Sequence, residues 1–259
     1  TYDGKGWQNV TAPLPADWQG LELDDAKVKA AFLNYAERMI SAFNPDYLII
    51  GVEVNLLIRK NPSKWSNYLA LHRYVYAEIK KSHPSLPVGV SLFCVPFFPE
   101  WSSEDNRAAQ LSGLADLESD VDFIAFSFHP FMSALLADDF PEDYIHQLFS
   151  LSNKPVAISE SSYPAQEWTT MSAPILTFKG TPAKQERFLS LMLNQCAESK
   201  ALFAIWFSIR DYDALWNGFD AATQSSSIVW RDTGLYDKSG AGRQALAVWR
   251  EWLAKEVSR

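Results

Sequence analysis

Five short apolar runs of strand character, separated by segments of helical periodicity, constrain the fold more than any other feature of this chain. The runs lie at about 47–54, 87–94, 121–128, 155–160 and 202–208. Segments with apolar residues three or four positions apart cover about 24–43, 63–82, 103–117, 141–151 and 240–256, and a further helix is predicted to begin at Thr181-Pro182. Strands that alternate with helices pair in parallel, so this order predicts a βαβ series.

The predicted strands are apolar along their whole length. Phe123-Ile-Ala-Phe126 and Phe203-Ala-Ile-Trp206 are typical of parallel strands that helices cover on both faces. No Gly/Ser-rich or Pro-rich linker divides residues 1–259, so we expect one α/β domain. Two architectures fit, a doubly wound open sheet and a (β/α)8 TIM barrel. Polar and aromatic residues follow several different strands, which favours the barrel.

The number of strands is too small for a closed barrel. A barrel of this type needs eight strands, and the sequence offers five. The residues before the first run, 1–46, hold one predicted helix and an irregular stretch. We therefore expect the chain to contain strands four to eight, with the first strands missing or supplied separately. Strands found within residues 1–46 would contradict this expectation.

The composition excludes several classes of function. The net charge is −8 and no run of Lys or Arg is present, so we expect no nucleic-acid partner. Cys94 and Cys196 fit neither a disulfide framework nor a zinc site, and we interpret them as buried free thiols. No strand is followed by a glycine-rich fingerprint, and no apolar run is long enough to cross a bilayer. We expect no metal, no cofactor and no membrane partner.

Two of the strand-like runs end in a glutamate, Glu53 and Glu160. Burying a carboxylate is costly without compensation, so a charge at the tip of an apolar strand needs a reason. A structural arginine partner is one reason. Two carboxylates that converge on one cleft are another, because glycoside hydrolysis uses one carboxyl as acid/base and a second as nucleophile. Aromatic residues make up 14% of the chain, and such rings fill cores or stack on sugars.

Several segments resemble a known group of enzymes. They are Tyr47–Asn55, Asp122–Phe131, Val156–Pro164 and Ile205–Asp213, which are similar to strands four, six, seven and eight of clan A glycoside hydrolases. The nearest relatives are the endo-β-1,4-galactanase-like families, glycoside hydrolase family 53 among them. The resemblance covers the chain from about residue 20 and extends to the C-terminal segment that begins at Asp232. It implies a retaining mechanism with Glu53 as acid/base and Glu160 as nucleophile.

The resemblance also implies roles for residues near these glutamates. His129 matches a strand-six position that bonds the nucleophile, and a satisfied strand-end histidine is the alternative. Trp206 matches the tryptophan beneath the sugar at the cleavage point, and a core tryptophan is the alternative. Asp211, Asp213 and Trp216 are candidates to bond or stack on sugars, unless the aspartates form a salt-bridged loop beside Arg210.

One position departs from the family pattern. Relatives carry asparagine directly before the acid/base, where it bonds the sugar 2-hydroxyl, and this chain has Val52. Hydrogen bonds to that hydroxyl strengthen in the transition state, so valine should cost activity. Asn55 is a candidate to reach the substrate instead.

The sequence thus predicts a glycosidase acting on a β-linked polysaccharide or oligosaccharide. A catalytically weak or inactive barrel that binds glycans is the alternative, motivated by Val52. Another type of α/β hydrolase is disfavoured, because no Gly-x-Ser-x-Gly elbow and no His/Cys metal cluster is present. We expect a secreted or periplasmic protein. The sugar, the linkage, endo or exo action and the oligomeric state stay open.

Overall fold

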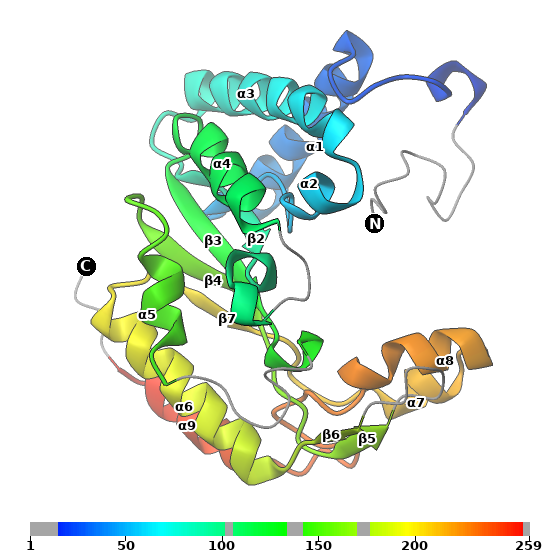
Figure 1. The fold of residues 1–259 in the computed structure, drawn as a ribbon, viewed down its shortest axis with the longest axis vertical. Coiled ribbons are helices and arrows are strands. Elements are labelled where there is room, and N and C mark those ends of the chain that lie inside the picture. Colours follow the sequence, from blue (N-terminus) through cyan, green and yellow to red (C-terminus); the bar gives the residue numbers. More distant parts are fainter. Residues whose placement is uncertain (1–14, 102–105, 134–141, 170–176, 256–259) are drawn as a thin grey trace. The chain divides into compact units, whose positions relative to one another are not determined.

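The structure is a computed structural model that describes residues 15–101, 106–133, 142–169 and 177–255 (Figure 1). The chain forms two compact units. The first comprises Thr1–Phe97, Glu104–Phe126 and Ser152–Val156, and the second comprises Phe98–Ser103, Ser127–Leu151 and Ala157–Arg259. Glu53 belongs to the first unit and Glu160 to the second. Each unit is described by itself.

Five strands form one sheet in the order β1-β2-β3-β4-β7. They are β1 Leu48–Ile49, β2 Val88–Phe93, β3 Phe123–Phe128, β4 Val156–Ser161 and β7 Ala204–Trp206. β1 pairs with β2 in parallel, and so does β4 with β7. Each strand lies within one residue of its predicted run, although β1 and β7 are much shorter than expected. The predicted parallel α/β sheet is therefore confirmed.

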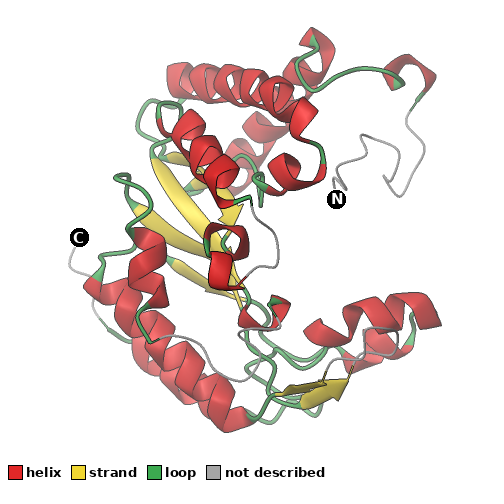
Figure 2. Ribbon diagram, viewed as in Figure 1, coloured by secondary structure: helices red, strands yellow, loops and turns green. Residues whose placement is uncertain are grey.

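The six predicted helices are all present, as Figure 2 shows in red. They are α1 Ala26–Phe43, α3 Trp65–Ser82, α4 Arg107–Glu118, α5 Tyr144–Phe149, α6 Pro182–Glu198 and α9 Gln244–Leu253. Thr181 caps α6 by accepting the Lys184 N–H at 3.1 Å, and Pro182 occupies the first turn, where its missing N–H costs nothing. At the other end of the sequence, α1 stops at Asn44, which adopts the left-handed conformation (φ 43°) that commonly ends helices.

The sequence missed four short elements. They are helices α2 Leu56–Lys60, α7 Asp213–Asn217 and α8 Ala221–Ser227, and an antiparallel hairpin of β5 Glu167–Thr169 and β6 Thr177–Lys179. All are too short for an apolar period to show. In the described part of residues 1–46, from residue 15 on, the structure has the 3-10 helix η2 Ala16–Trp18 and α1, but no strand.

The core of the first unit surrounds β2 and the start of β3. All six residues of β2 are buried, and Gly89 lets the backbones approach, since a Cβ there would lie 2.6 Å from the Phe123 carbonyl oxygen. Asp122 fixes the edge of this core. Its carboxylate accepts hydrogen bonds from the Val88 N–H, the Lys80 ammonium and the Tyr76 hydroxyl, each at 2.9 Å.

The core of the second unit is an aromatic cluster beneath α6. Phe188 stacks near Phe128 and Tyr163 with ring centroids 5.9 and 5.3 Å apart. The helices α6 and α9 lie side by side (Figure 1). The buried Gln185 of α6 donates to the carbonyl oxygens of Tyr163, Thr233 and Gly234, which ties the helix to the loops beyond the strands.

Both cysteines are buried and free, as the sequence predicted. Burial raises the pKa of Cys196 to about 12, so the thiol stays protonated. Among the described helices, none combines the length and the apolar character needed to cross a bilayer.

Candidate active site

Glu160 lies near the end of β4 in the second unit, with its side chain one-third exposed. Its carboxylate Oε2 is 3.9 Å from Nε2 of His129. The strand backbone is held on one side by β7, where the Ile158 N–H donates to the Phe203 carbonyl at 3.0 Å. The sheet therefore holds the backbone of β4 before Glu160, and the register against β7 shifts between Ile158 and Ser161.

His129 directly follows β3 and is almost completely buried, with 2% of its surface exposed. Its Nδ1 lies 2.7 Å from the Ser162 hydroxyl oxygen. Its Nε2 has no hydrogen-bond partner within the described residues, and Glu160 is the charged group beside it. The structure thus places His129 next to Glu160 without a hydrogen bond between them, and the bond to a nucleophile that the family resemblance implied stays a prediction.

Aromatic rings enclose this histidine. The Trp230 ring stands edge-on to the imidazole with centroids 4.7 Å apart, and Phe131 lies 5.7 Å away. Phe207, which follows β7, also contacts Trp230 edge-on at 5.6 Å. The sequence analysis missed Trp230 and Ser162. Ser162 had a signal, because it lies two residues beyond Glu160 and so on the same side of an extended chain. Trp230 had none.

Trp206 has the surroundings of a core residue. It is 8% exposed, its indole N–H donates to the Thr233 carbonyl at 3.1 Å, and its ring packs near Phe188. The indole nitrogen is therefore engaged, and the ring is largely covered. The structure favours the core interpretation over the sugar platform that the resemblance implied.

Asp211 is part of a buried ion pair. Both of its carboxylate oxygens accept from Arg243, at 2.8 and 2.6 Å, and one also accepts the Gly234 N–H at 2.9 Å. Burial raises the pKa of Asp211, and the bonds from Arg243 and Gly234 act in the opposite direction. The salt-bridged loop is thus the better interpretation, although its arginine is Arg243 and not the neighbouring Arg210. Asp211 is not available to a sugar.

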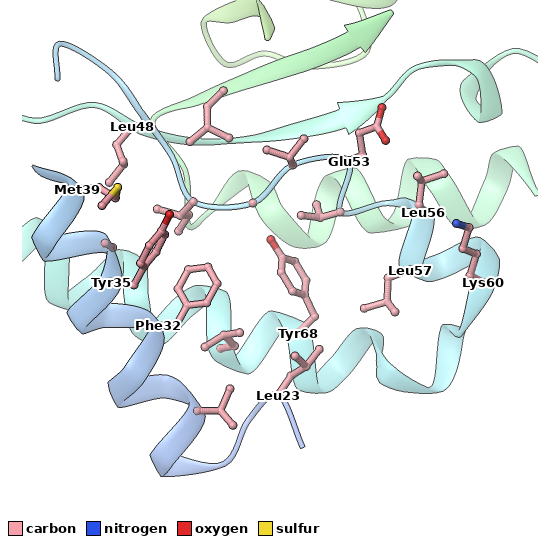
Figure 3. A pocket seen from close by; sticks show the side chains of 18 residues that line it. Leu23, Phe32, Tyr35, Met39, Leu48, Glu53, Leu56, Leu57, Lys60 and Tyr68 are labelled. Carbon is pink, nitrogen blue, oxygen red and sulfur yellow. The ribbon is translucent and has the colours of Figure 1, made fainter. Parts of the chain in front are cut away.

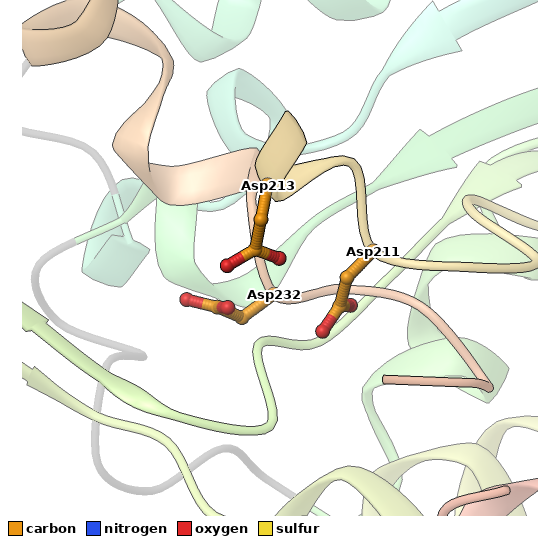
Figure 4. Close-up of side chains that lie close together, drawn as sticks. All are labelled: Asp211, Asp213 and Asp232. Atoms are coloured by element: carbon orange, nitrogen blue, oxygen red, sulfur yellow. The ribbon is translucent and has the colours of Figure 1, made fainter. Parts of the chain in front are cut away.

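Three carboxylates gather beyond β7, those of Asp211, Asp213 and Asp232 (Figure 4). Their nearest oxygens all lie within 4.8 Å of one another. Arg243 binds Asp211, and Arg231 binds Asp232 through two nitrogens at 3.0 and 2.9 Å, whereas Oδ2 of Asp213 is buried without a hydrogen-bond partner among the described residues. The arrangement is an ion-pair network in which arginine supplies the positive charge.

Trp216 lies on α7 and is half-buried. Its indole N–H donates to the Gln224 carbonyl at 3.1 Å, and the Arg231 guanidinium lies over its ring, 5.0 Å from the centroid. These contacts give Trp216 a role in holding α7 and α8. A stacking sugar would have to use the part of the ring that stays exposed.

Glu53 belongs to the first unit and lies in the loop between β1 and α2. Its backbone has φ 51°, a left-handed conformation that costs a glutamate about 1–3 kcal/mol. Burial, and then the negative charge of Glu53, raise the pKa of the Cys94 thiol at the end of β2. The carboxylate of Glu53 therefore lies near Cys94, beyond the carboxyl end of β2. Residues with strained backbones of this kind cluster at functional sites.

A cavity of about 660 Å³ lies next to Glu53 in the first unit (Figure 3). Its walls come from α1, the segment from β1 to α2, and α3, and they are mainly apolar; Phe32, Tyr35, Leu48 and Tyr68 are among the side chains labelled there. The Tyr68 hydroxyl is buried without a hydrogen-bond partner among the described residues. Glu53 is thus a polar group on the margin of an apolar hollow.

The two residues that flank Glu53 in the predicted motif have different fates. Val52 is 63% exposed, so its side chain is open to solvent. Asn55 is 1% exposed, and its amide bonds the Phe93 backbone at both N–H and C=O, at 2.7 and 2.9 Å, and the Gln110 side chain at 2.8 Å. Asn55 is therefore a structural residue, and not the substrate contact that the sequence suggested.

Comparisons with known proteins address the fold. No family model and no curated protein matches this chain. Solved structures do match, and one is the family GH53 catalytic domain of Ignisphaera aggregans, with 17% identity over 91% of this chain and 68% of that chain, at a TM-score of 0.61. A structure of fungal β-1,4-galactanases matches with 19% identity over 92% of this chain and 71% of that chain, also at 0.61.

A third likeness extends beyond the galactanases. A GH5-family protein of Streptomyces cattleya matches with 14% identity over 95% of this chain and 60% of that chain, at a TM-score of 0.62. At these identities the likeness shows the fold alone. The five-stranded parallel sheet with its helices is thus consistent with part of a (β/α)8 barrel, and the resemblance to clan A glycoside hydrolases, galactanases among them, is confirmed at the level of fold.

Proposed function

We propose that this chain carries the catalytic site of a retaining glycoside hydrolase that acts on a β-linked polysaccharide or oligosaccharide. The observation that carries the proposal is the setting of Glu160, a half-buried carboxylate on β4, 3.9 Å from a buried histidine in an aromatic enclosure. The structural neighbours support it, since they include fungal β-1,4-galactanases and a GH53 catalytic domain. The five-stranded parallel sheet is consistent with part of a (β/α)8 barrel.

The mechanism assigns one task to each glutamate. Glu160 attacks the anomeric carbon and forms a glycosyl–enzyme ester, while Glu53 gives its proton to the departing glycosidic oxygen. Glu53 then takes a proton from water, which attacks the same carbon and releases Glu160. Net retention follows from two inversions. The mechanism requires the two carboxyl groups to be about 5–5.5 Å apart, a distance that a crystal structure tests.

A covalent trap tests the assignment of the nucleophile. A 2-fluoro aryl β-glycoside slows both steps, and a good leaving group lets the ester accumulate. Digestion and mass spectrometry should then find one glycosyl adduct on the peptide that contains Glu160. The Glu160→Gln variant should give no adduct. Turnover without any adduct, or an adduct on another carboxylate, would contradict the assignment.

A glycan-binding barrel with little or no activity is the second candidate. Val52 favours it, because valine cannot bond the sugar 2-hydroxyl and the buried Asn55 cannot take over that bond. Calorimetric binding of β-linked oligosaccharides, together with a panel of aryl β-glycosides and polysaccharides, separates the two candidates. Binding without turnover, unchanged in Glu160→Gln, favours the binding protein. A polysaccharide substrate would also place the protein outside the cytoplasm, as a secreted or periplasmic enzyme.

A further inference from the structure

Glu160 and Ser162 lie beside the two ring nitrogens of the same histidine. The Ser162 Oγ is 2.7 Å from Nδ1 of His129, and the Glu160 Oε2 is 3.9 Å from Nε2. Residues two apart on an extended chain point to the same side, so one short segment at the end of β4 supplies both neighbours. The imidazole is thus held between a neutral hydroxyl and an ionisable carboxyl.

The buried hydrogen bonds decide where the proton of the neutral ring lies. Ser162 is completely buried, and within the described residues its hydroxyl bonds His129 alone. If Nδ1 carried the proton, the serine hydrogen would be buried without an acceptor, which is costly. The hydroxyl therefore donates to Nδ1. A neutral imidazole that accepts at Nδ1 carries its hydrogen on Nε2, the nitrogen that faces Glu160.

We propose that Ser162 is a positioning residue that fixes His129 as the Nε2–H tautomer, so that the neutral ring donates a hydrogen bond to the Glu160 carboxylate. The inference rests on the proposed role of Glu160 as nucleophile. Glu160 is one-third exposed, so its side chain has room to rotate and shorten the 3.9 Å separation. Hydrogen bonds at active sites often tighten only when substrate is bound.

Neighbouring rings keep the imidazole in this orientation. Trp230 stands at 87° to it and Phe131 at 54°. Glu160 is the charged group that the described structure places against the ring. A ring held by aromatic faces cannot easily turn over, so the identity of the Nδ1 partner decides which nitrogen carries the proton. That partner is Ser162.

Nitrogen NMR of the full chain with ¹⁵N-labelled histidine tests the tautomer directly. The chain has four histidines, and the signals of His129 are those lost in His129→Gln. At about pH 8, above the ordinary histidine pKa of about 6.5, His129 should show a protonated Nε2 and an unprotonated Nδ1. Ser162→Ala should shift both signals towards the other tautomer or a mixture of the two.

Ser161 provides the matched control. It is equally buried, but its hydroxyl has no hydrogen-bond partner among the described residues. Ser161→Ala should leave the His129 signals unchanged. In kinetic assays, Ser162→Ala should lower kcat/KM by about 10- to 100-fold. This is the effect of losing the hydrogen bond from His129 to the charged Glu160 carboxylate. Ser161→Ala should lower it far less.

The outcomes separate this inference from the proposed function. A protonated Nδ1 in the parent protein, or signals that do not move in Ser162→Ala, would overturn the inference whatever the activity. A tautomer shift without a loss of kcat/KM would also overturn it. If Ser162→Ala does not fold, Ser162→Cys keeps the size and weakens the donor, and it should show the same shift in smaller degree. Failure of the covalent trap at Glu160 would instead contradict the proposed function and leave the NMR result intact.

Discussion

The segments around Glu53 and Glu160 look alike in the sequence, but the two glutamates have different secondary structure and different neighbours. Glu160 belongs to a strand of six residues whose register against β7 shifts between Ile158 and Ser161, and a buried histidine that contacts aromatic rings lies beside it. Glu53 follows a strand of only two residues, in a loop with φ 51°, beside an apolar cavity. The polar residue next to it, Asn55, is used to bond the backbone of β2.

Two glutamates with similar positions in the sequence therefore lie in different local structures, one in a strand and the other in a loop. The nucleophile role proposed for Glu160 requires donors held in place, and Nε2 of His129 lies 3.9 Å from its carboxylate. The acid/base role proposed for Glu53 requires a group that gains and loses a proton, and Glu53 lies beside a mainly apolar cavity. Substitutions at Glu160, Glu53 and Val52 test this contrast, and substitutions at Arg243 and Asp122 test one ion pair in each unit.

The largest effect on kcat is expected from substitution of the two glutamates, and the losses should depend differently on the leaving group of the substrate. Glu160→Gln should lower kcat by roughly 10⁴-fold or more on every substrate, because no nucleophile remains. Glu53→Gln should cost about 10²- to 10⁴-fold on a polysaccharide. It should cost much less on a dinitrophenyl glycoside, whose leaving group needs no proton. Steady-state kinetics on both substrates measure the contrast, and equal losses for the two variants would show that the roles are not divided in this way.

The buried ion pair should give the largest effect on stability. Arg243→Met leaves the carboxylate of Asp211 buried without its main partner, and both side chains are at least nine-tenths buried. Breaking one partner of a buried pair costs about 3–5 kcal/mol in the free energy of unfolding. Urea titration followed by circular dichroism measures it. Arg210→Met is the matched control, because Arg210 is an exposed arginine next to Asp211 in the sequence. A similar loss in both variants would argue against a special role for the buried pair.

A smaller, pH-dependent effect is expected at Asp122 in the first unit. Burial alone would raise its pKa, but the bonds from Val88, Lys80 and Tyr76 outweigh burial and hold it below the ordinary value of 3.8. The carboxylate therefore stabilises the folded state above about pH 4, and this contribution is lost as the pH falls through the lowered pKa. Asp122→Asn should cost about 1–2 kcal/mol at neutral pH.

The pH dependence provides the check on that prediction. The free energy of unfolding is compared at about pH 7 and about pH 3. The difference between parent and Asp122→Asn should shrink at the lower pH, because the parent carboxylate has begun to take up a proton. A difference that stays constant would show that the lost bonds do not depend on the charge of Asp122.

The smallest effect should come from Val52→Asn. The side chain is 63% exposed, so the change should alter stability by no more than about 0.5 kcal/mol. If an asparagine there bonds the sugar 2-hydroxyl, kcat should rise by about 10-fold, a gain of one hydrogen bond in the transition state. Val52→Thr has a similar shape and a shorter reach, and serves as control. A purely glycan-binding protein would gain affinity without turnover.

Much of the fold could be predicted from the sequence. Each of the five strands lies within one residue of an apolar run, and Thr181-Pro182 marked the start of α6. These signals are local, because periodicity and capping depend on neighbours along the chain. The hairpin of β5 and β6 and the short helices α2, α7 and α8 were missed, because three to seven residues are too few to show a period.

The candidate site was predicted less evenly, and the reason is long-range packing. His129 could be placed near Glu160, but Trp230 could not, because it lies far along the chain and carries no motif. Asn55 and Asp211 were candidate substrate contacts because of their positions after strands, and Trp206 was one because of the family resemblance, with a core tryptophan as the alternative. Their side chains instead bond Phe93, Thr233 and Arg243, and such partners cannot be read from local sequence.

The order of strands and helices, and the glutamate at the end of two strands, could be read from the sequence. Both depend on the pattern of apolar residues among neighbours along the chain. Which polar side chains are hydrogen-bonded within the fold follows from contacts between residues far apart in the sequence. A buried polar atom must find a partner wherever the fold brings one. Asn55 and Asp211 therefore bond other residues of the fold. Ser162 bonds Nδ1 of His129, and Nε2 of the same ring faces Glu160.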